Sequence, residues 1–119
     1  MSDIISPVQV ESAIRDVANR MATGVKVCSD RYAAFLEADH AYDVAYARAY
    51  MGHEGAAHEK KYAAVLACQA ERDVRDAADV AYRHADRRAK ALDAELRSLQ
   101  SVGASLRVQY GVAGRGEGA

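Results

Sequence analysis

The 119-residue chain has no tryptophan, one phenylalanine, one proline and two cysteines. An all-β domain needs many turns, and a single proline does not suit one. The two cysteines, Cys28 and Cys68, do not form a close-spaced pair, so the expectation is reduced thiols in a cytoplasmic protein. No apolar run approaches the ~20 residues that cross a bilayer, and Met1-Ser2-Asp3 lacks the basic start of a signal peptide. The sequence therefore predicts no membrane contact.

Bulky aliphatic side chains are also scarce. Half of the chain is apolar, but alanine supplies 26 residues, whereas Val, Ile, Leu and Phe together supply 22. Burying alanine removes little area from water, at about 25 cal/mol per Å². A lone monomer would therefore be thinly stabilised, and this predicts a homo-oligomer.

Charge of one sign does not dominate either. The net charge is −1, with −4 on residues 1–79 and +3 on residues 80–119. Twelve of the sixteen basic residues are arginine. Arginine suits bidentate contacts with phosphate, but it also suits salt bridges along a helix face. Global charge therefore names no partner.

What the sequence does have is one long alanine-rich stretch, Ala56 to Leu106, which is typical of a single helix without a proline break. Its apolar side chains recur in steps of four and three, as in a coiled-coil seam. The predicted seam is Ala63, Ala67, Ala70, Val74, Ala77, Ala81, Ala85, Ala89, Leu92, Leu96, Leu99, Gly103 and Leu106. An extra step of four between Ala81 and Ala85 predicts a stutter that relaxes the supercoil locally.

A second seam precedes it, after a helix start in which Ser6 can cap, Pro7 takes the first helical position and Gln9 can close a capping box. Its members are Val10, Ile14, Val17, Met21, Gly24, Cys28, Arg31, Phe35, Ala38, Tyr42, Ala45 and Ala49, with Tyr32, Leu36, Tyr46 and Tyr50 beside them. Glycine costs about 1 kcal/mol against alanine inside a helix. This arm is therefore either one helix or a short and a longer helix that break near Gly24.

The predicted fold class is all-α, a long antiparallel two-helix hairpin resembling a coiled coil. Residues 1–110 form one domain, with arm one at 7–51, a turn at 52–55 marked by two glycines, and arm two at 56–110. Positions whose numbers sum to about 107 should face each other across such a turn. Residues 111–119 hold four glycines and are predicted to be a flexible tail.

Arm two is longer than arm one, so its C-terminal turns from Leu92 to Tyr110 are expected to lack a partner within the monomer. These turns still carry a good seam. We therefore predict that they form the oligomerisation segment, through Leu92, Leu96, Leu99 and Leu106.

Metal and enzyme chemistry find little support in the sequence. Glu37 and His40 have the Glu-x-x-His spacing of a di-iron carboxylate site, which needs two such motifs and two more glutamates. His53 and His58 are five apart across a turn glycine, so they do not share a helix face as zinc ligands would. No nucleophile constellation or phosphate loop is present, and the prediction is a non-enzyme without cofactor or metal.

Basic and aromatic side chains do gather around the predicted turn. A set of this kind suits single-stranded nucleic acid, in which phosphates pair and bases stack. The set comprises Arg48, Tyr50, Lys60, Lys61 and Tyr62, and a second basic group comprises Arg83, Arg87 and Arg88. The alternative is that the tyrosines cap the hairpin core and the lysines form a solvated face. Asp79 lies four residues before Arg83 and should neutralise part of its charge.

The layout resembles the UvsY-like recombination mediators of bacteriophages. The likeness lies in the hairpin through Ala-Tyr-Ala-Arg-Ala-Tyr at 45–50 and Glu-Lys-Lys-Tyr at 59–62, in the small-residue seam of arm two, and in the closing segment Glu95 to Arg107. The resemblance implies a ring-like homo-oligomer that binds single-stranded DNA, helps load a RecA-type recombinase in place of a single-strand-binding protein, and hydrolyses nothing. The modest net charge of the chain is a departure from this family and argues against strong DNA binding.

Two functions follow as hypotheses. In the first, the chain is a phage DNA-metabolism accessory protein of the host cytoplasm, in which Arg48, Lys60 and Lys61 contact phosphates while Tyr50 and Tyr62 stack on bases. In the second, it is a coiled-coil adaptor, such as a phage scaffold or a host-protein-binding protein, that uses its leucine seam and binds no nucleic acid. A di-metal four-helix protein, made by duplicating Glu37 and His40 in a dimer, is a third alternative.

Overall fold

The computed structural model describes residues 6–118, with side chains described as far as Gly111. Its regular elements are all helices, in the order α1 (Pro7–Gly52), α2 (Ala57–Ala67) and α3 (Gln69–Gly118). The all-α class is thus confirmed for the described residues. The chain divides into two compact units, which we treat separately. Unit 1 combines Met1–Val25 with Arg87–Ala119, and unit 2 is Lys26–Asp86.

The start of α1 is built as the sequence predicts. The backbone N–H of Gln9 donates to the Ser6 hydroxyl oxygen at 3.2 Å, and the N–H of Val10 donates to the Ser6 carbonyl at 3.1 Å. Ser6 therefore satisfies donors that the first helical turn would otherwise leave open. From there α1 continues to Gly52 without interruption, so the alternative with a break near Gly24 does not apply.

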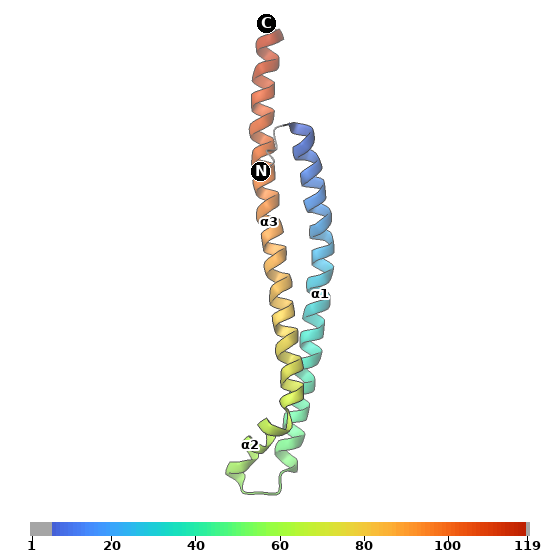
Figure 1. The fold of residues 1–119 in the computed structure, drawn as a ribbon, viewed down its shortest axis with the longest axis vertical. Coiled ribbons are helices and arrows are strands. Elements are labelled where there is room, and N and C mark those ends of the chain that lie inside the picture. The colour runs from blue at the N-terminus through green and yellow to red at the C-terminus, as the bar shows by residue number, and fades with distance from the viewer. Residues whose placement is uncertain (1–5, 119) are drawn as a thin grey trace. The chain divides into compact units, whose positions relative to one another are not determined.

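In unit 1, the first turns of α1 and the later turns of α3 lie side by side and run antiparallel (Figure 1). Val10, Val17 and Leu99 are the buried bulky residues of this pair. Gly103 is buried where the two helices approach closely, since a Cβ there would lie 3.2 Å from Val10 Cγ1. The prediction that Leu92–Tyr110 lacks an intrachain partner is therefore wrong as far as Leu106, whereas residues 107–110 are exposed. Leu99 is buried within the chain, and Leu92, Leu96 and Leu106 are half-buried.

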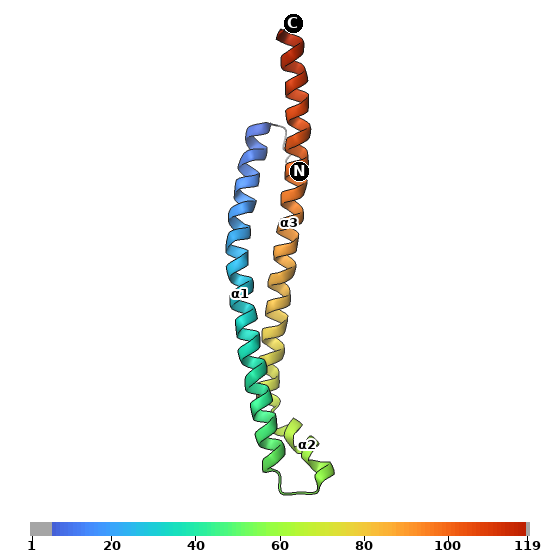
Figure 2. The ribbon, with the colours of Figure 1, turned by 180° about the vertical axis from the view of Figure 1, so that it is seen from behind.

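In unit 2, the later turns of α1 pack against α3, and α2 is inclined away from α1 near the turn (Figure 2). Arm two is therefore not one helix. Cys68 interrupts it with φ −108° and ψ 19°, away from helical values, although its N–H still donates to the Ala64 carbonyl at 3.1 Å. The bend accompanies complete burial of Ala64 and Cys68, which are 0% and 1% exposed.

The register of the two arms also differs from the prediction, because the bend at Cys68 takes α2 out of line with α3. The pairs that meet are Val10 with Gly103, Tyr32 with Tyr82, and Asp39 with Arg75. Their numbers sum to 113 or 114, so each residue of α1 meets a residue about one heptad later in α3 than a sum of 107 implies.

The seam of arm two lies one residue away from its predicted position in unit 2. Val74 of the predicted seam is 62% exposed, and Ala67, Ala70 and Ala77 are exposed as well. Ala63 and Ala81 of the predicted seam are half-buried, but the line that is buried or half-buried at every position is Ala64, Cys68, Glu71, Arg75, Ala78, Tyr82 and Ala85. These continue into Ala89, Leu92, Leu96, Leu99, Gly103 and Leu106 in unbroken steps of four and three, so no stutter is needed. The predicted seam of α1 is confirmed except at Arg31, which is exposed.

Helix α3 extends beyond the predicted end of arm two at residue 110. It continues through Gly118, and Ala119 lies outside the described residues. The flexibility of residues 111–119 stays a prediction. Glycine weakens a helix by about 1 kcal/mol per residue, but it keeps the N–H that the helix needs. No proline follows Gly111, so nothing in the sequence stops the helix there.

Gly24 offers a direct test of helix stability in α1. A Cβ built at Gly24 meets nothing within 4 Å, and the residue has helical backbone. We expect Gly24→Ala to raise the free energy of unfolding by about 1 kcal/mol, measured by urea denaturation. Gly103→Ala is the matched control, because its Cβ crowds Val10 and should cancel part of the same gain. Equal gains at both positions would contradict the close approach at Gly103.

Candidate nucleic-acid interface

The turn between α1 and α2 consists of residues 53–56 and is held by a side-chain contact across it. His53 Nε2 lies 3.4 Å from Glu59 Oε2. A Cβ at Gly55 would collide with the His53 ring and crowd the Glu59 carboxylate. A larger residue at position 55 would therefore displace the tips of these two side chains and disturb their contact. This contact positions the start of α2, whose N-cap residue Ala56 makes no side-chain capping bond.

Three tyrosines on α1 form a ladder, which we define as Tyr42, Tyr46 and Tyr50. Their spacing of four residues places them above one another on one helix face. Ring centroids are 6.1 Å apart for Tyr42–Tyr46 and 6.2 Å apart for Tyr46–Tyr50, and the second pair is stacked at 27°. Sequence reasoning noted these tyrosines separately but missed the ladder, although the spacing alone would have shown it.

A cation lies over the ring at each end of this tyrosine ladder. The Lys60 ammonium is 5.9 Å from the Tyr50 centroid, and the Arg75 guanidinium is 4.3 Å from the Tyr42 centroid. Cations in these positions are attracted by the ring faces. The structure thus brings together Tyr50 and Lys60, two of the residues predicted for the turn. It also places Arg75, which was not among the predicted residues, against the ring of Tyr42.

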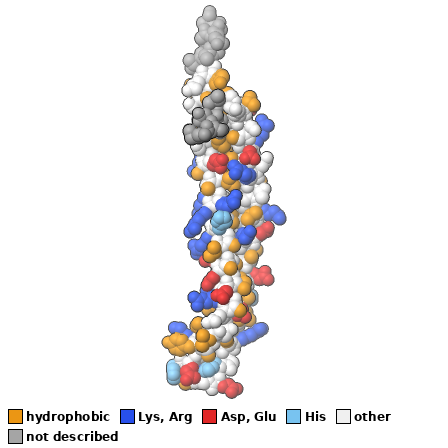
Figure 3. All heavy atoms as spheres, viewed as in Figure 1, with side chains coloured by type: hydrophobic (Ala, Val, Ile, Leu, Met, Phe, Trp, Pro, Cys, Tyr) orange, Lys and Arg blue, Asp and Glu red, His pale blue; other side chains and the backbone are white. Residues whose placement is uncertain are grey.

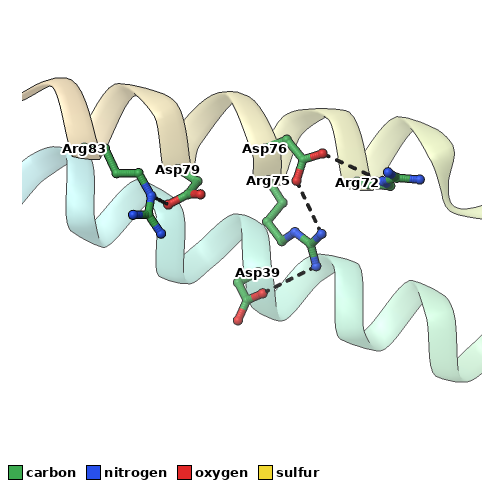
Figure 4. Close-up of polar contacts among 6 residues, drawn as sticks. All are labelled: Asp39, Arg72, Arg75, Asp76, Asp79 and Arg83. Atoms are coloured by element: carbon green, nitrogen blue, oxygen red, sulfur yellow. Dashed lines mark hydrogen bonds and ion pairs between the residues drawn. The ribbon is translucent and has the colours of Figure 1, made fainter.

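Arg75 comes from the seam of α3 and reaches across to α1. Its guanidinium lies 4.0 Å from Asp39 and 3.3 Å from Asp76, while Asp76 also faces Arg72 at 3.7 Å (Figure 4). The Arg75 side chain is only 28% exposed. Its charge is therefore largely balanced by carboxylates, and it acts mainly as a fixed support for Tyr42.

The other residues predicted for the turn are exposed, and none of them is seen stacked against the tyrosine ladder. Arg48 and Lys61 are exposed, and Tyr62 is 67% exposed. Tyr62 is two residues from the fully buried Ala64, so it lies on the opposite side of α2 from the core. The space-filling view shows hydrophobic side chains gathered over α2, with basic and histidine side chains beside them (Figure 3).

The second basic group is partly neutralised. Arg83 donates to Asp79 at 2.9 Å, as the four-residue spacing predicts. Arg87 and Arg88 are exposed. The boundary between the two units falls between Arg83 and Arg87, so these arginines belong to different units.

A thiol and a carboxylate meet inside unit 2. Burial raises the pKa of the Cys68 thiol, and the negative charge of Glu71 raises this pKa further. The thiol therefore stays protonated and is a poor nucleophile. One oxygen of Glu71, Oε2, is buried and finds no hydrogen-bond partner among the described residues.

Metal binding gains no support from the described residues, among which no group of three His, Cys, Asp or Glu side chains could hold an ion. Glu37 and His40 are both exposed. Within the same part of the chain, no helix is long and apolar enough to cross a membrane.

The chain matches no protein-family model, no curated protein and no solved structure.

Proposed function

We propose that this chain is a non-enzymatic accessory protein that binds single-stranded DNA at the turn end of unit 2. In this proposal it is a phage-type recombination mediator that helps load a RecA-type recombinase and exchanges with a single-strand-binding protein. The observation that carries it is the tyrosine ladder with Lys60 over its last ring, Tyr50. The resemblance to UvsY-like mediators supports the recombinase part.

The chemistry of the ladder end fits an unpaired strand. A base can stack on the Tyr50 ring, which is 39% exposed, while phosphates pair with Lys60 and with the exposed Arg48 and Lys61. Stacking is tolerant of sequence, because every base has a π face. Tyr62 lies on the far side of α2, so it would take a base from a strand that passes around this helix.

Replacing both lysines tests the proposal. We expect Lys60→Ala/Lys61→Ala to weaken binding of a labelled oligothymidylate about tenfold or more at 50 mM salt, because two phosphate contacts are lost. The slope of log affinity against log salt should fall by about 1.4, since each contact with a single strand contributes about 0.7. Fluorescence anisotropy of the labelled oligonucleotide, titrated at about 50 to 200 mM salt, gives both the affinity and the salt slope.

The matched control is Lys26→Ala. Lys26 is an exposed lysine of α1 that faces Asp30 at 3.7 Å. Its loss should leave the affinity almost unchanged. If the oligonucleotide shows no anisotropy change with wild-type protein in the tens of micromolar, on the order of weak non-specific affinities, the DNA function fails.

One observation favours a coiled-coil adaptor as the second candidate. The outer side of α2 carries Tyr62 and Leu66, 67% and 69% exposed and four residues apart, and Met51 is 81% exposed. Such a pair suits docking to a protein such as a phage scaffold or host factor. Leu66→Asp separates the two functions, because an adaptor loses its partner protein whereas a DNA-binding protein keeps its oligonucleotide affinity.

A further inference from the structure

The two ends of the tyrosine ladder differ in how firmly a cation covers them. At one end, the Arg75 guanidinium lies 4.3 Å from the Tyr42 centroid. Two carboxylates hold this guanidinium, Asp39 at 4.0 Å and Asp76 at 3.3 Å (Figure 4). Because a guanidinium is a rigid planar group, two carboxylates on it can fix its orientation. The Tyr42 end of the ladder is therefore closed to a ligand.

The other end of the ladder, at Tyr50, is open. Tyr50 is 39% exposed, and the Lys60 ammonium lies 5.9 Å from its ring centroid. This distance is at the outer limit of about 6 Å within which a ring face attracts a cation. Lysine carries its charge on a flexible four-carbon stem, so the ammonium can leave the ring for a nearby phosphate. A planar group can therefore stack on Tyr50 without breaking a firm contact.

The inner rings of the ladder do not offer a second place for a base. Tyr42 and Tyr46 are half-buried. Neighbouring ring centroids lie 6.1 Å and 6.2 Å apart, within the range of about 4.5–7 Å in which aromatic pairs attract each other. A base inserted between two of these rings would have to break such a pair. The ladder therefore offers a ligand one ring, that of Tyr50.

We propose that the ladder takes one unpaired base per chain, stacked on Tyr50 with its neighbouring phosphates beside it, and that Arg75 is the positioning residue for this base. This inference rests on the proposed DNA function and names the ligand of that site, a short single-stranded segment of any base sequence. A duplex does not fit, because its bases are stacked on one another. Arg75 acts through the ladder, since Tyr42 and Tyr50 are eight residues, about 12 Å, apart along α1.

Strands that lack bases test the stacked base. We compare labelled strands of about five nucleotides, at the short end of known single-strand sites, that carry thymine or an abasic site at each position. The all-thymine strand should bind about tenfold more tightly than the all-abasic strand, because one base stacks, whereas the salt slopes should be equal. Adding thymines one at a time should raise the association constant linearly, because each adds one way to fill the same site. Several stacking sites would multiply the gains instead.

Replacing Arg75 tests its positioning role. Arg75→Leu should lower the preference for thymine over abasic strands to about twofold, with an unchanged salt slope, because no phosphate contact is lost. Arg75→Lys keeps a cation for the Tyr42 ring and should keep most of the preference. Tyr50→Leu should abolish the preference. The matched control is Arg72→Leu, which should leave it unchanged, because Arg72 faces Asp76 at 3.7 Å and lies outside the ladder.

The outcomes separate this inference from the DNA function. If the wild-type protein binds neither these strands nor a longer oligothymidylate, the DNA function fails and this inference fails with it. Binding only to the longer strand, equal affinity for thymine and abasic strands, or a gain that multiplies with each thymine overturns the one-base site and leaves the DNA function standing. A lower salt slope in Arg75→Leu would show that Arg75 contacts a phosphate itself and does not position the ladder. Equal helix content by circular dichroism confirms that the variants compared are folded.

Discussion

Val17→Asp should unfold unit 1. Val17 is 1% exposed and belongs with Val10 and Leu99 to the few bulky residues buried there. An aspartate at this position would leave a charge without water or a partner, which costs about 4 kcal/mol or more. That is comparable with the whole stability of many small domains. Circular dichroism at room temperature should show a loss of helix, and thermal melting should show a lower midpoint.

Val25→Asp provides the control for helix propensity and charge. It makes the same chemical change in the same helix, but Val25 is 66% exposed, so the new carboxylate remains in water. Its effect on stability should be within about 0.5 kcal/mol. Val17→Ala should fall between these two variants, because it removes buried methyl groups without adding a charge. Equal melting of the two aspartate variants would contradict the pairing of α1 with α3 in unit 1.

The parts of the fold that sequence could predict are those with bulky apolar residues at regular spacing. Val10, Ile14 and Val17 mark one face without ambiguity, and Ser6 marks the helix start, so the seam of α1 and its cap were predicted correctly. The later seam of α3, which carries four leucines, was also placed correctly.

Unit 2 was harder to predict because alanine does not distinguish an inner face from an outer one. Alanines follow both the true seam and the exposed line of Ala70, Val74 and Ala77, and a choice by apolarity favours the exposed line. The true seam passes through Glu71, Arg75 and Tyr82, which an apolar pattern rejects. Arg75 covers the Tyr42 ring and Tyr82 lies 5.0 Å from Tyr32, so long polar side chains fill the space that leucines would otherwise take.

The candidate interface was predictable only where it is local. Tyr50 and Lys60 lie on the two sides of one short turn, so sequence proximity brings them together. Arg75 meets Tyr42 only in a particular register of the two arms, and the backbone at Cys68 shifts that register by about a heptad. A single residue with non-helical φ and ψ inside an alanine-rich run does not change the spacing of apolar residues in the sequence, so the spacing could not predict it.

Glu71→Leu should stabilise unit 2. The Glu71 Oε2 atom is buried and lacks a hydrogen-bond partner among the described residues, so this one oxygen is removed from water without a bond in return. A leucine fits the seam position and adds the bulky apolar group that unit 2 lacks. The expected gain is about 1–3 kcal/mol in the free energy of unfolding, measured by urea denaturation.

Arg75→Leu is the appropriate comparison, since it makes the same kind of change one seam position later. Arg75 already has Asp39, Asp76 and the Tyr42 ring as partners, so its replacement should gain little or destabilise. Glu71→Gln isolates the charge: it should lower the pKa of the Cys68 thiol, which the Glu71 carboxylate raises, and so speed its alkylation at alkaline pH. Loss of stability in Glu71→Leu, with an unchanged Cys68 pKa in Glu71→Gln, would place Glu71 outside the seam and restore the predicted line of Ala70, Val74 and Ala77 as the face toward α1.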